Sequence, residues 1–119
     1  MIRLAAALLL SLAVPGAADE GSIGAGAVLR ALDKVDGSTA DLEVPTGYKA
    51  RIYGLDVAVG ECRFPAGDPA GDAFAFLQIS EGAAQAEPLF TGWMIASSPA
   101  LNALDHARYD VWVLRCITS

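Results

Sequence analysis

Short apolar runs separated by Gly, Pro and Asp turn signals are the feature that most constrains this chain. The run "ADLEV" at 40–44 alternates strictly, with Leu42 and Val44 on one face and Asp41 and Glu43 on the other. That period of two is typical of a half-buried strand. Comparable runs occupy residues 27–35, 48–59, 73–80, 89–97 and 109–117. About seven short strands predict an all-β fold, a small antiparallel β-sandwich or barrel.

The size of the chain predicts one domain, because 119 residues can bury one hydrophobic core but not two. We place this single β domain at residues 27–117. The preceding stretch "DEGSIGAG" at 19–26 is small, polar and rich in glycine, and we expect it to be flexible. Within the run at 48–59, which is long for one strand, Gly54 predicts a bulge or bend.

The first residues predict export. Arg3 precedes an apolar run from Leu4 to Val14, and Pro15 is followed by small residues up to Ala18. This is the three-part layout of a secretory signal peptide, and the run is too short for a membrane span, which needs about 20 residues. We therefore predict a signal peptide over 1–18, cleaved after Ala18, and a periplasmic protein. An uncleaved membrane anchor is the alternative.

Cys62 and Cys116 are the only cysteines, an even number in a chain predicted to enter an oxidising compartment. A redox pair is usually spaced Cys-x-x-Cys, and a structural zinc site needs about four ligands. Neither pattern is present, since the chain offers one histidine beside two distant cysteines. We predict a structural disulfide between Cys62 and Cys116, and no metal site or cofactor.

Two runs are apolar on both faces. In "AFAFLQIS" the side chains of Phe74 and Phe76 point one way, while those of Leu77 and Ile79 point the other way. The run "VWVLRCI" at 111–117 has the same character. We expect these strands to be covered on both faces, either by the loops of the domain itself or by a docked partner.

A short helix is predicted near 99–105. Ser98 is a good N-cap and Pro99 fits the first helical position. Leu101 and Leu104 lie three residues apart and would share one face of this helix.

The same region holds the residue types of a hydrolase triad, namely Ser97 or Ser98 with Asp105 and His106. The sequence argues against catalysis, because neither serine lies in a G-x-S-x-G elbow and Asp105 is adjacent to His106. We expect Ser98 to cap the helix and His106 to end it or to bond a backbone carbonyl.

Charge and the remaining motifs exclude several classes of function. A net charge of -6 argues against nucleic acid and against an anionic membrane surface. Asp68 and Asp72 lie in the loop "GDPAGD" but lack the ligand pattern that calcium needs, so we interpret them as turn residues.

The chain resembles the exported family known as domain of unknown function 2155, found mainly in alphaproteobacteria. The resemblance covers roughly residues 27 to 117 and rests on "CRFP" at 62–65, "GDAFAFLQI" at 71–79 and "FTGWMIASSPALNALDHARYDVWVLRC" at 90–116. Phe64 stands where the family often has tyrosine, Asp68 where it has asparagine, and Ala107 where it has proline. The resemblance implies an envelope protein with no established catalytic residue. It also implies a gene neighbourhood shared with an accessory subunit of the respiratory NADH–quinone oxidoreductase.

These observations favour a non-enzymatic structural or interaction domain in the periplasm, either a cell-envelope factor or an accessory to a membrane respiratory complex. The alternative is a small envelope hydrolase or ligand-binding protein that uses the region 92–110. The candidate surface for a partner or ligand comprises Trp93, Met94, Asn102, His106, Tyr109 and Trp112.

Overall fold

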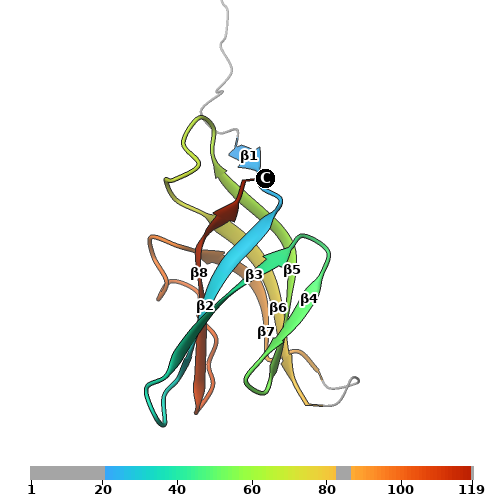
Figure 1. Cartoon of the computed structure of the whole chain (residues 1–119), viewed down its shortest axis with the longest axis vertical. Coiled ribbons are helices and arrows are strands. Elements are labelled where there is room, and N and C mark those ends of the chain that lie inside the picture. Colours follow the sequence, from blue (N-terminus) through green and yellow to red (C-terminus); the bar gives the residue numbers. More distant parts are fainter. Residues whose placement is uncertain (1–20, 83–86, 119) are drawn as a thin grey trace, which may run out of the picture.

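The computed structural model of the chain describes residues 21–82 and 87–118 (Figure 1). These residues form eight β-strands and no helix. The strands are β1 (Gly21–Ile23), β2 (Gly26–Asp33), β3 (Thr39–Pro45), β4 (Lys49–Ile52), β5 (Leu55–Pro65), β6 (Phe74–Glu81), β7 (Phe90–Ile95) and β8 (Tyr109–Ile117). The all-β prediction is confirmed. The structure differs from the expected set of strands in two places: Tyr53 and Gly54 turn the chain and divide the run at 48–59 between β4 and β5, and residues 21–23 form the unpredicted strand β1.

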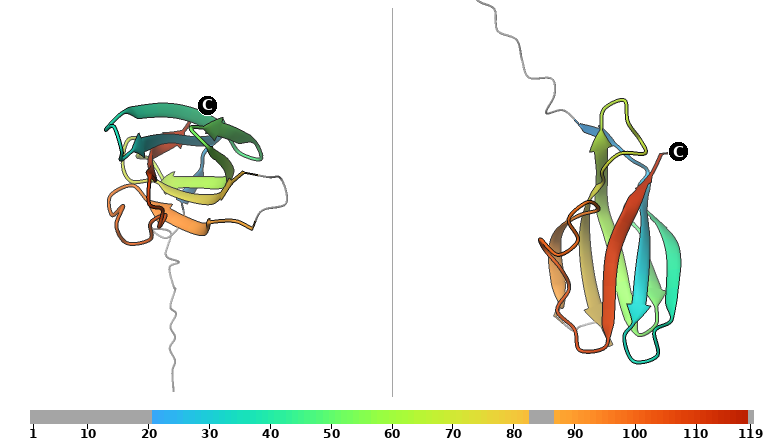
Figure 2. Two further views of the ribbon diagram at one scale, coloured as in Figure 1. Left: turned by 90° about the horizontal axis from the view of Figure 1, so that it is seen from below. Right: turned by 90° about the vertical axis from the view of Figure 1, so that its left-hand side faces the viewer.

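The strands form two antiparallel sheets that are not closed into a barrel (Figure 2). In the five-stranded sheet β5 is the central strand: β6 pairs with one edge of β5 and in turn with β7, while β1 and β4 pair with the other edge. The three-stranded sheet has the order β3-β2-β8. Viewed from below, the two sheets lie as layers on either side of one core (Figure 2).

Alternation along each strand decides which side chains fill this core. On β6, Leu77 and Ile79 are fully buried, whereas Phe74 and Phe76 point outward and are only partly buried. On β8, Val111 and Val113 are buried, while the outward neighbours Trp112 and Leu114 are partly exposed. The described loops of the domain therefore leave the outward apolar side chains of β6 and β8 partly exposed, and the alternative of a docked partner stays a prediction.

Part of the stretch that we expect to be flexible, residues 19–26, pairs with the sheets of the domain. Residues 21–23 pair with β5 as strand β1, and the chain then crosses from one sheet to the other. At the crossing Gly24 donates its N–H to the carbonyl of Cys62 at 2.7 Å. A Cβ at Gly24 would lie 2.9 Å from the Cβ of Cys116, so only glycine leaves room there. Residues 19 and 20 and the predicted signal peptide lie outside the described residues.

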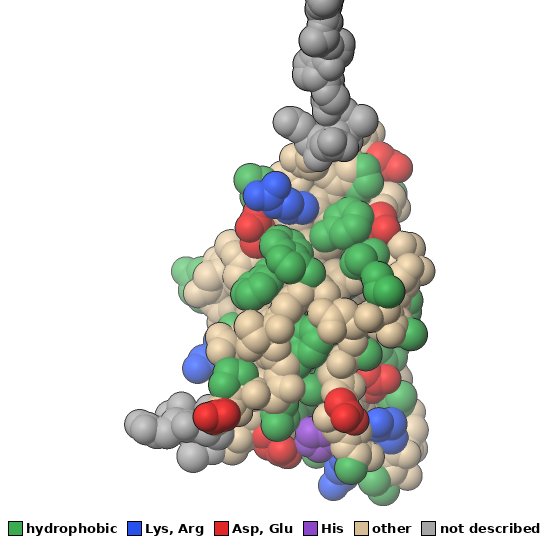
Figure 3. Space-filling view, turned by 180° about the vertical axis from the view of Figure 1, so that it is seen from behind, with side chains coloured by type: hydrophobic (Ala, Val, Ile, Leu, Met, Phe, Trp, Pro, Cys, Tyr) green, Lys and Arg blue, Asp and Glu red, His purple; other side chains and the backbone are tan. Residues whose placement is uncertain are grey.

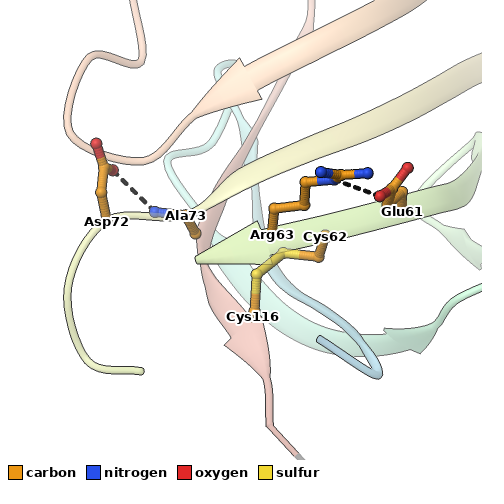
Figure 4. Close-up of a disulfide and its surroundings, with 6 residues drawn as sticks. All are labelled: Glu61, Cys62, Arg63, Asp72, Ala73 and Cys116. Atoms are coloured by element: carbon orange, nitrogen blue, oxygen red, sulfur yellow. Dashed lines mark hydrogen bonds and ion pairs between the residues drawn. A yellow bond between two sulfur atoms is a disulfide. The ribbon is translucent and has the colours of Figure 1, made fainter. Parts of the chain in front are cut away.

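The predicted pairing of Cys62 with Cys116 is confirmed, since the two residues lie at disulfide distance with their Cα atoms 5.7 Å apart (Figure 4). Cys62 belongs to β5 and Cys116 to β8, so the bond joins the two sheets. Both side chains are buried. On the opposite face of β5, the side chains of Glu61 and Arg63 form an ion pair (Figure 4).

Candidate functional site

The predicted surface of six residues does not form one surface. Trp93 lies on the outward face of the five-stranded sheet and is 40% exposed, whereas Trp112 lies on the outward face of the three-stranded sheet. The prediction that Met94 belongs to this surface is wrong. Met94 is 2% exposed and belongs to the core, because it alternates with Trp93 along β7. The two tryptophans are separated because the chain changes sheet between β7 and β8.

The loop between β7 and β8 contains a turn where a helix was predicted. Leu101 donates its N–H to the carbonyl of Ser98 at 3.0 Å, and no helical hydrogen bonds continue from there in the described loop. Leu104 is buried while Leu101 is 71% exposed, so the two leucines do not share a face. Asn102 holds the loop against β7 by donating its Nδ2–H to the carbonyl of Trp93 at 2.9 Å. These tertiary contacts outweigh a helix signal that rested on one cap and one proline.

Ser97, one of the two candidate nucleophiles, is bound to Asp72. The hydroxyl of Ser97 donates to Oδ2 of Asp72 at 2.6 Å, and the N–H of Ser97 and the N–H of Ala73 each donate to Oδ1 at 2.9 Å. Partial burial raises the pKa of the Asp72 carboxyl, but the hydrogen bonds from Ser97 and Ala73 outweigh it and hold the pKa below its usual value. This clamp ties the end of β7 to the start of β6.

His106 orders the turn that precedes β8. Its Nδ1 accepts the N–H groups of Arg108 and Tyr109 at 2.9 and 3.1 Å. Because Nδ1 acts as an acceptor, the hydrogen of the neutral ring resides on Nε2, which lies 3.1 Å from Oε1 of Glu81. The ring also packs against Tyr109 at 5.2 Å between centroids. Each ring nitrogen of His106 is therefore engaged in holding the loop.

The triad residues are too far apart to act together. Ser97 is held by Asp72, which precedes β6, whereas His106 is held by Glu81, the last residue of β6. A strand of eight residues spans roughly 25 Å. Ser97 and His106 thus lie at opposite ends of β6 and form no nucleophile–base pair.

The carboxylates of the loop at 65–72 do not assemble a cation site. The carboxylate of Asp72 accepts hydrogen bonds from Ser97 and Ala73. The carboxylate of Asp68 lies against Gly71, where an added Cβ would be 2.6 Å from Oδ2 of Asp68. Within residues 21–82 and 87–118, no group of three His, Cys, Asp or Glu side chains is placed to hold a metal ion.

Sequence reasoning missed a polar cluster that lies where β2 ends and β8 begins. Asp33 is 4% exposed and accepts a forked pair of bonds from Arg108, with Nη2 2.9 Å from Oδ2. The hydrogen bonds from Arg108 lower the pKa of Asp33 below its usual value, against the opposing effect of burial. Beside them the rings of Tyr53 and Tyr109 stack in parallel at 5.5 Å. An aspartate ending an apolar strand was the available signal, but its partner lies 75 residues away.

The outward face of the five-stranded sheet carries an apolar patch of four side chains, Phe74, Phe76, Trp93 and Ile95. Strand register places them in two rows, with Phe76 opposite Trp93 and Phe74 opposite Ile95. The rings of Phe76 and Trp93 meet edge to face at 5.4 Å. Figure 3 shows this side of the molecule, with hydrophobic side chains gathered over its upper half and charged side chains at its upper and lower ends.

A groove of about 540 Å³ adjoins the patch at Phe76 and runs over β5 and β6. It is lined by residues that include Tyr48, Lys49, Gly60, Phe76, Gln78 and Ser80. Sequence reasoning missed this groove, because its residues come from separate strands and only the pairing of those strands brings them together. Gln78 and Ser80 alternate with the buried residues of β6, which was the available signal that they face outward.

The fold and these surfaces define a class: a small all-β domain of two antiparallel sheets joined by a disulfide, with a partly exposed apolar patch. The described residues contain no helix long and apolar enough to cross a membrane. The chain belongs to the DUF2155 family, described as an uncharacterized protein conserved in bacteria, whose model matches residues 27–116. No curated protein and no solved structure matches it.

Proposed function

We propose that this chain is an exported, non-enzymatic binding domain of the periplasm, which holds an envelope or membrane-complex protein against its apolar patch. Export is supported by the leader-like layout of residues 1–18. The Cys62–Cys116 pair is compatible with an oxidising compartment.

The observation that carries the proposal is the partial exposure of the apolar patch. Trp93 is 40% exposed, and its neighbours Phe74, Phe76 and Ile95 are each only partly buried. Contiguous apolar surface of this kind marks binding sites on soluble domains, and tryptophan is enriched among the residues that dominate binding energy. The Glu61–Arg63 ion pair lies beside the patch and supplies part of a polar rim.

The other outward face is a weaker candidate. Trp112 is paired in register with Arg30, whose guanidinium forms a two-bond ion pair with Asp41 at 2.7 and 3.0 Å. This charged pair makes the surroundings of Trp112 more polar than those of Trp93. We therefore assign the partner to the five-stranded sheet.

The contacts of Ser97 and His106, the candidate catalytic residues, favour binding over hydrolysis as the function of this chain. Ser97 is clamped to Asp72, and His106 uses both ring nitrogens to hold its own loop. Neither side chain contributes to the apolar patch. The proposed role is thus that of a cell-envelope factor or an accessory to a membrane respiratory complex, with no chemistry of its own.

Affinity purification of the tagged full chain from solubilised membranes tests this proposal. Trp93→Ser should reduce recovery of the partner by about tenfold or more, as expected when a central aromatic anchor is removed. Leu101→Ser is the matched control, because Leu101 is 71% exposed but lies on the loop after β7, outside the patch.

Equal recovery with the wild-type chain and Trp93→Ser would contradict the assignment of the patch. Equal losses with Trp93→Ser and Leu101→Ser would point to non-specific adhesion. The identity of the captured protein then decides between the two envelope roles: subunits of a respiratory complex support the accessory role, and other envelope proteins oppose it.

A further inference from the structure

We infer that the groove over β5 and β6 is a binding site for a neutral saccharide chain. This site adjoins the apolar patch proposed above for the protein contact and shares Phe76 with it. Three observations carry the inference: the space beside Gly60, the chemistry of the lining and the place of the groove on the sheet.

Gly60 lines the groove beside the ring of Phe76. A Cβ at Gly60 would lie 3.1 Å from Cδ2 of Phe76, which is closer than ordinary van der Waals contact. The backbone at Gly60 is outside the left-handed region, so the conformation of the chain does not itself require glycine. The missing side chain instead leaves space beside the ring of Phe76. The volume of the whole groove, about 540 Å³, falls within the usual range of small-molecule sites.

The lining combines aromatic rings with neutral hydrogen-bonding groups. Tyr48 is 66% exposed and Phe76 is partly exposed, while Gln78 and Ser80 supply an amide and a hydroxyl. Among residues 21–82 and 87–118, the side chains of Gln78 and Ser80 form no hydrogen bond to another residue, so both can bond to a ligand. Of the described residues that line the groove, Lys49 is the one cation and none is acidic.

This chemistry selects a ligand that is uncharged and has both apolar and hydrogen-bonding surfaces. A phosphate-rich polyanion would need several cations, and the lining supplies one. A fully apolar ligand would leave the amide of Gln78 and the hydroxyl of Ser80 without partners. A pyranose ring meets both requirements. Its C–H face can cover an aromatic ring, and its hydroxyl groups can form hydrogen bonds with the amide of Gln78 and the hydroxyl of Ser80.

The position of the groove argues against an extended peptide. Peptides that add to a sheet bond to the free backbone groups of an edge strand. Here the floor is formed by β5 and β6, which pair with each other and with strands on their other edges. Their backbone groups are largely used in these ladders, so a ligand in the groove is recognised by side chains.

Calorimetric titration of the purified full chain with two neutral β-1,4-linked hexasaccharides, cellohexaose and hexa-N-acetylchitohexaose, tests the inference. At least one should bind with a Kd of about 1 mM or tighter. Gln78→Ala should weaken this binding about tenfold, the scale of one lost hydrogen bond. Thr91→Ala is the matched control, because Thr91 pairs with Gln78 on the same face but does not line the groove.

Gly60→Val should abolish binding by filling the space beside Phe76, with a thermal melt to check folding. If Gly60→Val does not fold, Gln78→Ala still decides the question. The inference is overturned if neither hexasaccharide binds at about 10 mM, if Gln78→Ala binds as tightly as the wild type, or if a decaproline peptide binds in their place. Gln78→Ala should leave partner capture unchanged, so failure here is distinct from failure of the proposed protein contact.

Discussion

Reducing the Cys62–Cys116 disulfide should lower the free energy of unfolding by about 4 kcal/mol. The bond joins residues 54 positions apart, and the chain-entropy model assigns about that penalty to a loop of this length at 25 °C. The loss is large against the ~5–15 kcal/mol that stabilises a typical domain. Since the bond links β5 in one sheet to β8 in the other, its removal leaves the two sheets held together by the core that they share and by the chain that crosses between them.

Equilibrium denaturation in guanidinium chloride, followed by tryptophan fluorescence, measures this difference. The oxidised and the reduced wild-type chain have the same side chains, so their comparison isolates the covalent link. The double variant Cys62→Ala/Cys116→Ala should lose at least as much, because the two side chains are 0% and 3% exposed and their removal also leaves a cavity.

The double variant should not respond to reductant, which makes it the control for other effects of the reducing agent. A reduced wild-type chain within about 1 kcal/mol of the oxidised chain would refute the loop-entropy reasoning. Two free thiols in protein isolated without reductant would refute the disulfide itself.

Three further outcomes follow from local geometry. Ser97→Ala should cost about 1–1.5 kcal/mol in a denaturant melt, because it removes an exposed hydrogen bond to the Asp72 carboxylate, whereas Ser98→Ala should stay within about 0.5 kcal/mol; equal costs would contradict the clamp. The lowered pKa of Asp72 gives stability that is present above the unfolded pKa and is lost as the pH falls through the folded pKa, so wild-type stability should fall more steeply with acid than that of Asp72→Asn in melts between about pH 5 and pH 2; parallel curves would count against it. Gly24→Ala should destabilise the domain by about 1–3 kcal/mol through its close approach to Cys116, while Gly54→Ala, whose Cβ would meet nothing closer than 3.9 Å, should be tolerated; a harmless Gly24→Ala in a thermal melt would show that the crossing can shift.

Local patterns in the sequence determined the strands and their buried faces. The alternation at 40–44 correctly placed Leu42 and Val44 inward and Asp41 and Glu43 outward. An even cysteine count was enough to pair the two cysteines. These features were readable because side-chain direction in a strand repeats every two residues, and because two cysteines allow one pairing.

The tertiary structure alone decided how the strands were distributed between sheets, and with it the candidate site. Trp93 and Trp112 belong to one continuous run in the sequence, yet they face opposite sides because β7 and β8 join different sheets. The helix signal at Ser98 lost to the contacts of Leu104 and Asn102, since a single turn has little intrinsic stability. The groove beside Gly60 depends on the register in which β5 and β6 pair, which places Gly60 beside the ring of Phe76, and that register is set by which side chains the core buries.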